Sequence, residues 1–445
     1  MSKTLMMCVA AALCMALVFC NGKIRQEKPD VELGEGAPEV EVLYDEDSAY
    51  YTNVIFLNPY NDAAYIERGN IFYRKGDSAR AAADYAEAIR INPQLADEYL
   101  TSGNSYSDKG DHNQAISDYT VAIRLKPDFA IAYYNRGGSY FAKDDHDQAI
   151  SDHTEAIRLK PDFAIAYNNR GYVYFNKGDH DQAIADYNEA IRLNPNIAMA
   201  YYNRGNSYSA KGDHDQAIAD YTKAIRLKPD FVAAAYLNRG AMYNEKDDYD
   251  SAILDFNEAI RLNPKYVEAY NNRGYAYLAK DEYDKAISDY TETIRLKPDF
   301  LMAYLNRGAM YNEKGDYDSA ISDFNEAIRL NPKFVEAYHN RGYVHLAKGE
   351  YDKAISDYTD ALELYLELGS KDTNVFIAYA YKNRGLACMG KIEYDKAIVD
   401  FETALRIFPN TEEEQENIAE VKKDLEEARK KLEETKKQNK TDGRK

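Results

Sequence analysis

A proline recurs along this sequence at a nearly constant interval. One interval is a single residue longer than the others in the series: Pro59, Pro93, Pro127, Pro161, Pro195, Pro229, Pro264, Pro298 and Pro332. A glycine keeps the same rhythm: Gly69, Gly103, Gly137, Gly171, Gly205, Gly240, Gly274, Gly308, Gly342 and Gly385. Self-similarity at an interval of about 20 to 50 residues is the sequence signature of stacked repeats. The chain is therefore expected to build one small unit about ten times.

Residues 164–197 show how one such unit should fold. Small and aromatic residues first recur at spacings of three and four, the pattern of one helix face: Ala164, Tyr167, Gly171 and Tyr174. Gly178 and Asp179 then predict a turn. A second helix face follows: Ala183, Tyr187, Ala190 and Ile191. Pro195 should end this helix, because the residue before a proline is pushed out of the α region.

This pattern resembles the tetratricopeptide repeat. The family's series of aromatic, Gly, Tyr, Ala, aromatic, Ala and Pro is matched in order: Tyr167, Gly171, Tyr174, Ala183, Tyr187, Ala190 and Pro195. The resemblance covers residues 62–410. It implies an all-α, right-handed superhelical solenoid of about ten helix-turn-helix units, with the first helix of each unit lining the concave side.

Two further helices are expected to close the ends of the array. Residues 48–61 match the second helix of a repeat and predict a half-repeat helix that covers the first full repeat. Residues 411–437 begin with a capping-box pattern, Thr411 and Glu414. Apolar residues then follow at heptad spacing: Ile418, Val421, Leu425, Ala428 and Leu432. They predict a C-terminal capping helix, with dimerisation as the alternative to the monomer we expect, and residues 438–445 are expected to form a disordered tail.

An insertion interrupts the rhythm in the ninth repeat, between Pro332 and Pro409. Residues 361–368 continue as good helix formers up to Gly369. They predict a second helix about two turns longer than its siblings, which would project from the solenoid edge. Three residues could cap the helix after it: Asp372, Thr373 and Asn374. The alternative is a tolerated loop insertion.

The N-terminal segment is set apart from the repeats. Lys3 precedes an apolar run over residues 5–19, which is too short to span a bilayer comfortably. We interpret residues 1–20 as a secretory signal, and the alternative is a buried N-terminal helix. Residues 21–47 are acidic, contain Gly and Pro, and hold few large apolar groups, so they are expected to form a flexible linker.

Residues 17–20 resemble a bacterial lipobox that ends at Cys20. The resemblance implies that Cys20 is lipidated, although Phe19 departs from the small residue usual before the cysteine. Simple cleavage after Cys20 is the alternative. The protein is accordingly expected in the cell envelope as a membrane-anchored lipoprotein, and otherwise as a periplasmic or secreted protein.

Charge and motifs exclude several classes of function. The formal net charge is −19, so the surface should repel nucleic acid and anionic lipid. Membrane contact is expected only through an N-terminal lipid. The sequence holds no phosphate-binding glycine loop, no HExxH motif and no GxSxG motif. We therefore expect neither an enzyme nor a cofactor.

Two recurrent polar features have structural interpretations. A histidine occupies one position in four successive repeats: His112, His146, His180 and His214. Stacked helices lie roughly 8–10 Å apart, too far for such histidines to share one zinc at about 2 Å, so we expect aromatic contacts at the helix start and no metal. In addition, an Arg of the first helix precedes an Asp of the second by a constant interval, as in Arg136 and Asp152. This spacing predicts a repeated structural ion pair.

The candidate binding site is a ladder of asparagines, two residues before the recurrent glycine: Asn135, Asn169, Asn203, Asn238, Asn272, Asn306, Asn340 and Asn383. A carboxamide both donates and accepts hydrogen bonds, so a regular row could bind the backbone of an extended peptide. The row resembles the asparagine ladder in the repeat domain of O-linked N-acetylglucosamine transferase. Aromatic neighbours would line the groove: Tyr134, Phe141, Tyr172, Phe175, Tyr202 and Tyr275. The alternative is that the amides only satisfy local backbone groups.

A carboxylate clamp of the kind found in chaperone-binding relatives is not expected. Such a clamp needs Lys at first-helix positions that hold other residues here: Tyr134, Asn168, Tyr202, Leu237 and Asn271. The predicted function is a non-enzymatic scaffold that binds partner proteins or extended polypeptide in the concave groove. The alternatives are a regulatory or assembly subunit that holds an enzyme in the envelope, and a purely architectural protein.

Overall fold

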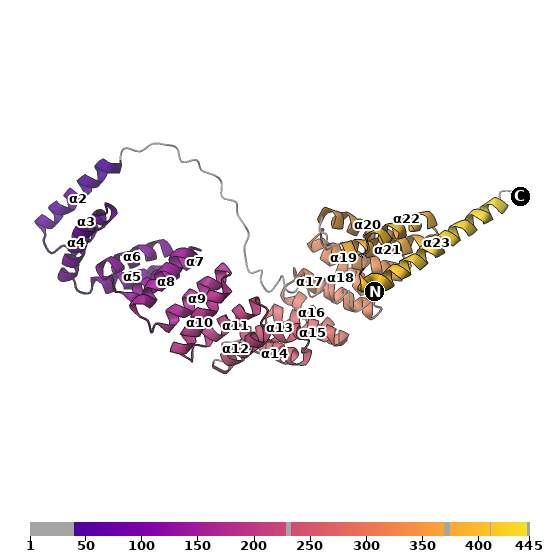
Figure 1. The fold of residues 1–445 in the computed structure, drawn as a ribbon, viewed down its shortest axis with the longest axis horizontal. Coiled ribbons are helices and arrows are strands. Elements are labelled where there is room, and N and C mark those ends of the chain that lie inside the picture. The colour runs from indigo at the N-terminus through magenta and orange to yellow at the C-terminus, as the bar shows by residue number, and fades with distance from the viewer. Residues whose placement is uncertain (1–39, 228–232, 369–373, 410, 443–445) are drawn as a thin grey trace. The chain divides into compact units, whose positions relative to one another are not determined.

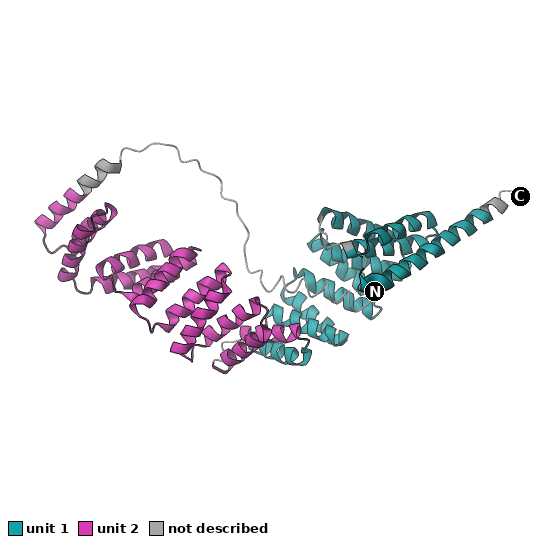
Figure 2. Ribbon diagram, viewed as in Figure 1, with its two compact units in different colours: residues 1–21, 247–445 teal, residues 22–246 magenta. Residues whose placement is uncertain are grey.

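The computed structural model describes residues 40–227, 233–368, 374–409 and 411–442. Over these ranges the chain forms 22 α-helices and one short 3₁₀-helix, and no strand (Figure 1). The predicted all-α solenoid of helix-turn-helix units is therefore confirmed, while the handedness of the superhelix stays a prediction. The helices belong to two compact units, residues 22–246 (unit 2) and residues 247–445 (unit 1) (Figure 2).

Unit 2 contains the half repeat and the first repeats. Its helices are α2 (Val40–Leu57), α3 (Asp62–Arg74), α4 (Ser78–Ile91), α5 (Leu95–Asp108), α6 (His112–Leu125), α7 (Ala130–Ala142), α8 (His146–Leu159), α9 (Ala164–Lys177), α10 (His180–Leu193), α11 (Ala198–Ala210), α12 (His214–Leu227) and α13 (Ala233–Glu245). From α3 onward, odd-numbered helices are first helices and even-numbered helices are second helices. From α3 to α11, each first helix packs against the second helix of its own repeat and against the helix before it.

Unit 1 continues the same alternation. Its helices are α14 (Tyr249–Leu262), α15 (Val267–Ala279), α16 (Tyr283–Leu296), α17 (Leu301–Glu313), α18 (Tyr317–Leu330), α19 (Val335–Ala347), α20 (Tyr351–Leu368), α21 (Asn374–Gly390), α22 (Tyr394–Ile407), the 3₁₀-helix η3 (Glu412–Glu414) and α23 (Gln415–Asp442). The last helix, α23, packs along α22 and closes the stack.

The recurrent glycine lets the two helices of a repeat approach closely. A Cβ atom on Gly205 would lie 2.7 Å from Cε1 of Tyr221, whose side chain is only 1% exposed. The turn between the helices needs a second special conformation, which Gly178 adopts with a φ of +84°. Asp179 then caps α10, because its carboxylate accepts a hydrogen bond from the backbone N–H of Gln182 at 3.2 Å. The recurrent glycine, the glycine of the turn and the capping aspartate together explain the helix-turn-helix unit.

Both ends of the array differ from the sequence-based boundaries. Helix α2 begins at Val40, so residues 40–47, which we assigned to the flexible linker, are helical. Helix α23 continues to Asp442, so residues 438–442, which we assigned to the disordered tail, are helical as well. Both corrections have one cause: once a helix is nucleated, each added residue gains a hydrogen bond at little further cost. The signal segment, Cys20 and most of the linker lie outside the described residues.

The C-terminal helix uses its apolar face inside the molecule. Val421, Leu425 and Ala428 are buried against α22 and α21. This packing favours the capping interpretation over dimerisation through the same residues. The predicted capping box is wrong, because Thr411 makes no side-chain cap bond and Glu414 instead accepts a hydrogen bond from the Tyr379 hydroxyl at 3.2 Å.

The insertion in the ninth repeat extends α20, but by less than we predicted. Helix α20 has 18 residues, whereas the preceding second helix α18 has 14, so the difference is about one turn. The added turn does not project freely, because the Tyr365 ring stacks on Phe376 of α21 at 6.2 Å. Tyr365 is buried. The candidate capping residues Asp372 and Thr373 lie outside the described residues.

Candidate polypeptide-binding face

The ladder asparagines lie on the first helices and are buried or half-buried. Three are at most 6% exposed: Asn203, Asn306 and Asn383. The other five are half-buried: Asn135, Asn169, Asn238, Asn272 and Asn340. The row is thus set into the surface between neighbouring first helices instead of standing out from it.

Amides of the ladder bond to side chains of the preceding repeat. Nδ2 of Asn135 donates to Oδ1 of Asn104 at 2.8 Å, and Nδ2 of Asn169 donates to the Tyr134 hydroxyl at 2.9 Å. Nδ2 of Asn203 reaches Oδ1 of Asn168 at 3.4 Å. These bonds differ from the local backbone bonds that we considered as the alternative. In unit 2 these amides join successive first helices to one another.

A second asparagine position completes the network in some repeats. It follows the recurrent glycine directly, and there Oδ1 accepts a hydrogen bond from the buried tyrosine of the second helix: Tyr85 to Asn70 at 2.9 Å, Tyr119 to Asn104 at 2.8 Å, and Tyr221 to Asn206 at 2.9 Å. Burial raises the pKa of Tyr119 to about 12, so the hydroxyl stays a donor. Sequence reasoning missed this position, although the constant separation between the Asn and the Tyr was a readable signal.

Three of the candidate aromatic residues form ring contacts between repeats. The Phe141 ring of α7 lies 5.3 Å from the Tyr172 ring of α9, and Tyr134 lies 5.0 Å from Phe163. Tyr172 is 41% exposed. The other candidate aromatic residues are half-buried: Tyr134, Phe141, Phe175, Tyr202 and Tyr275. Tyr172 is therefore the candidate residue that presents most surface to a partner.

Two of the four histidines at the start of the second helices pack on aromatic rings, as we predicted for all four, whereas His214 lies against the Met242 sulfur at 3.3 Å. The His146 ring lies 5.5 Å from Phe141, and His180 lies 5.3 Å from Phe175. In the part of the chain that the structure describes, no three His, Cys, Asp or Glu side chains are grouped to hold a metal ion. No helix among the described residues is long and apolar enough to cross a membrane.

The predicted ion pair is confirmed and is more buried than an ordinary surface pair. Both oxygens of Asp152 accept hydrogen bonds from Arg136 at 2.7 Å, with side-chain exposures of 16% for the Arg and 5% for the Asp. The same pair recurs in both units: Arg68–Asp84, Arg170–Asp186, Arg204–Asp220, Arg273–Asp289, Arg307–Asp323, Arg341–Asp357 and Arg384–Asp400. The bidentate geometry fixes the two helices of one repeat against each other.

Sequence reasoning missed a third bond of this arginine. Nη1 of Arg136 donates to the Thr120 hydroxyl at 3.0 Å, and Thr120 belongs to the second helix of the repeat before. Arg170 and Thr154 repeat the contact at 3.0 Å. The arginine therefore ties together three helices from two repeats. The sequence did contain a signal for this third bond. A Thr or Asn stands 16 residues before the Arg, just as the Asp stands 16 residues after it.

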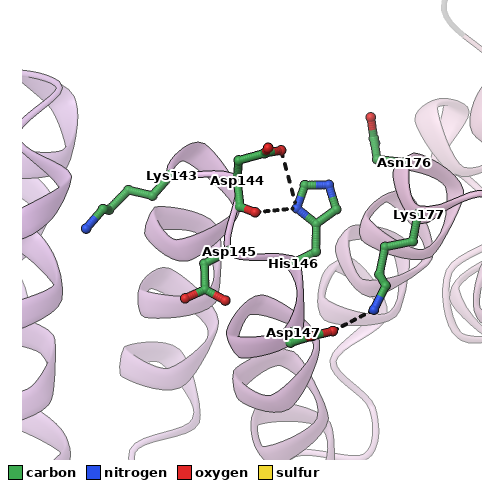
Figure 3. Close-up of a pocket in the computed structure, with 7 residues that line it drawn as sticks. All are labelled: Lys143, Asp144, Asp145, His146, Asp147, Asn176 and Lys177. Atoms are coloured by element: carbon green, nitrogen blue, oxygen red, sulfur yellow. Dashed lines mark hydrogen bonds and ion pairs between the residues drawn. The ribbon is translucent and has the colours of Figure 1, made fainter. Parts of the chain in front are cut away.

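An open pocket lies at the turn between α7 and α8, beside the end of α9 (Figure 3). Seven residues line it: Lys143, Asp144, Asp145, His146, Asp147, Asn176 and Lys177. Nδ1 of His146 lies 3.0 Å from the backbone oxygen of Asp144, and Lys177 pairs with Asp147 at 2.5 Å. Its charged groups thus bond mainly to one another and hold the turn against the next repeat.

Charge is distributed unevenly between the helices. Helices α7 and α11 each carry a single charged residue, the arginine of the buried pair. The turns and second helices carry most of the acidic groups, as in the α10 sequence with its two Asp and one Glu. The first-helix face of each unit, meaning the surface formed by its first helices and their ladder asparagines, is polar and aromatic. It is nearly uncharged at α7 and α11, whereas α3 carries four charged residues and α5 carries three.

Family models match most of the chain. Those described as tetratricopeptide repeat match residues 62–95, 164–197, 198–231, 267–300 and 334–410, and one described as TPR repeat matches residues 103–144, 137–178, 240–281 and 308–349. The chain belongs to the tetratricopeptide repeat family. Membership supports a protein–protein interaction scaffold, and this fold is typical of non-catalytic scaffolds.

Solved structures of tetratricopeptide repeat proteins are similar over part of the chain. MamA is 34% identical, with a TM-score of 0.36, over 37% of this chain and 95% of that chain. YrrB, described as a TPR protein with an unusual peptide-binding site, is 25% identical, with a TM-score of 0.39, over 42% and 96%. A repeat protein from Parabacteroides merdae is 21% identical, with a TM-score of 0.42, over 56% and 99%. A search of the curated proteins found no match.

Proposed function

We propose that this tetratricopeptide repeat protein binds extended segments of partner proteins on its first-helix face and performs no reaction on them. One observation supports the proposal above the others. Tyr172 is 41% exposed on a face that is otherwise set with half-buried amides, and its ring rests on Phe141. A tyrosine held in this way offers apolar area and a polar hydroxyl at low entropic cost, which suits protein recognition.

In this proposal the ladder asparagines mainly hold the face in shape and contribute less to peptide binding than the sequence suggested. Because amides such as Asn135 and Asn238 already bond to the preceding repeat, they hold the face in shape and offer only their remaining bonding capacity to a peptide. Alanine substitutions along the ladder would therefore lower stability as well as affinity. Tests of binding should change exposed residues of the face instead.

Photo-crosslinking tests the proposal with little disturbance of the fold. Benzoylphenylalanine placed at Tyr172 is an aromatic replacement on the first-helix face. The same group at Leu254 of α14 or Val399 of α22, which are 67% and 61% exposed on second helices, provides matched controls. We expect cross-linked polypeptide from the position-172 protein in cells, and little from the controls. Cross-links confined to the two control positions would overturn the proposal.

We also propose that the protein is exported and anchored by a lipid on Cys20. The support is the N-terminal sequence alone: Lys3, the apolar run over residues 5–19, and the lipobox-like segment. An anchored chain should partition with membranes, and the Cys20→Ser variant should be released to the soluble fraction. Unchanged membrane retention of Cys20→Ser would rule out the anchor.

A further inference from the structure

Repeats differ in how they pair two facing positions. The first position directly follows the recurrent glycine, and the second is the large buried residue of the second helix in the same repeat. Where the first position is Asn, the second is Tyr, and the two are bonded, as in Asn104 with Tyr119 and Asn206 with Tyr221. The third repeat holds Gly138 and His153 instead. Both members of the hydrogen bond are replaced there by smaller groups.

These replacements leave open space and an unsatisfied buried group. A Cβ atom added to Gly138 would meet no atom within 4 Å. His153 is 1% exposed, and among the described residues its Nδ1 has no hydrogen-bond partner. A buried polar atom left in this way carries a free-energy cost, and the histidine lacks the hydroxyl that fills this region in neighbouring repeats.

The ladder asparagine of the following repeat, Asn169, has one hydrogen-bond acceptor fewer than its counterpart Asn238. In the sixth repeat, Nδ2 of Asn238 donates both to the Tyr202 hydroxyl at 3.2 Å and to Oδ1 of Asn206 at 3.0 Å. In the fourth repeat, Nδ2 of Asn169 donates to the Tyr134 hydroxyl at 2.9 Å. Within the described part of the chain it has no second acceptor, because Gly138 stands where Asn206 stands two repeats later. One N–H of Asn169 is therefore available.

We propose that Gly138 opens a notch in the first-helix face that receives the main chain of a bound polypeptide. A backbone carbonyl oxygen of the peptide accepts the available N–H of Asn169, in the place that Oδ1 of Asn206 takes in its repeat. Glycine allows this approach because it has no side chain in the way. Gly138 and Phe141 lie on one helix face, so a neighbouring peptide side chain packs on the Phe141–Tyr172 ring pair. This inference rests on the proposed function.

The test fills the notch with the asparagine side chain that other repeats carry at this position. Gly138→Asn restores the carboxamide present at Asn104 and Asn206, supplies Asn169 with an internal acceptor and occupies the place of the peptide carbonyl. The control is Ala241→Asn, which introduces the same carboxamide at the same register position of α13. The probe is a short peptide selected from a random display library on the full wild-type chain. Gly138→Ala, which adds one methyl group to open space, replaces the Asn variant if that variant folds poorly.

We expect Gly138→Asn to weaken peptide binding by about tenfold or more, with Gly138→Ala intermediate and Ala241→Asn unchanged. Thermal unfolding should show that no stability is lost. Equal affinity for all variants would overturn the notch and leave binding elsewhere on the face. An equal loss in Gly138→Asn and Ala241→Asn would also overturn it as a distinct site. If no peptide in the library binds the wild-type chain, both the notch and the proposed function fail.

Discussion

The recurrent glycine and the large residue that faces it set the helix spacing within a repeat. The fit is tight, as for Gly205 against Tyr221, whereas Gly138, which directly follows the recurrent Gly137, faces open space. These two first-helix glycines, one recurrent and one at the next position, should therefore respond in opposite ways to the same methyl group. The comparison separates packing from helix propensity.

Gly205→Ala should destabilise the protein by about 1–2 kcal/mol, because the strain of overpacking exceeds the gain in helix propensity. Gly138→Ala should stabilise it by about 0.5–1 kcal/mol, since only the propensity term acts. Urea unfolding followed by circular dichroism measures both. A loss of stability in Gly138→Ala would show that the space beside α7 is filled.

Two buried histidines should make the fold sensitive to acid. Burial lowers the pKa of His153 to about 4 and that of His339 to about 4. Between about pH 6.5 and pH 4 the unfolded chain binds protons on these imidazoles that the folded chain does not bind. The free energy of unfolding should therefore fall as the pH falls, by up to about 1.4 kcal/mol per pH unit for each group.

His153→Phe should reduce this acid sensitivity, since Phe256 and Phe324 fill the same position in other repeats. The measurement is the unfolding free energy of wild type and variant between about pH 7 and pH 5. Removing both histidines should have roughly twice the effect. Parallel pH curves for wild type and His153→Phe would contradict the argument.

At the scale of the element, the helices were predictable and their cross-repeat contacts were not. Spacings of three and four residues, the Gly-Asp turn and the terminal proline predicted each helix-turn-helix unit. The bonds of Arg136 to Thr120 and of Asn169 to Tyr134 join different repeats. They depend on how far one repeat is shifted along the next, which a pattern read within one repeat does not contain. The ladder asparagines do lie on the first helices, while the bonds they make to the preceding repeat were missed, and their contact with a peptide stays a prediction.

Helix lengths were the other weak point of the sequence analysis. Boundaries in α2, α20 and α23 depend on whether a helix continues into a polar or inserted segment, and short-range propensity decides this poorly. The residues that anchor the ends were readable only in part. Glu414 looked like a capping residue, but the structure uses it to accept a hydrogen bond from Tyr379, which is far away in the sequence.

Removing the capping helix should damage the last repeats. Deletion of residues 411–445 exposes Phe401, which is fully buried, and removes the burial of Val421 and Leu425. The loss from these two side chains is about 3–6 kcal/mol. We expect a lower urea midpoint and aggregation in size-exclusion chromatography. Deletion of residues 438–445 alone should change neither, and a fully stable, soluble 411–445 deletion would show that α23 is no cap.

At the scale of the whole molecule, the chain separates its charge from its proposed binding face. The net charge of −19 falls mainly on second helices and turns, while α7 and α11 carry only a paired arginine. This arrangement leaves the first-helix face around α7 and α11 polar and aromatic. A partner bound there should meet few unpaired charges.

Peptide binding should therefore depend little on salt. Raising the salt from about 0.05 M to 0.5 M should change the dissociation constant of a library-selected peptide by less than about threefold. Salt weakens interactions between exposed charges, and few such charges are available to a peptide on this face. Fluorescence anisotropy gives the constant at each salt concentration. A steep loss of affinity would place the contact on the acidic second helices.

The measurement that tests the central claim most directly is hydroxyl-radical footprinting of the full chain with and without a bound polypeptide. The method reads the solvent exposure of individual side chains. We predict that Tyr172 loses reactivity in the complex, while Leu254 and Val399 on second helices, 67% and 61% exposed, keep theirs. Unchanged reactivity of Tyr172 together with protection of Leu254 or Val399 would contradict the claim that the first-helix face binds the partner.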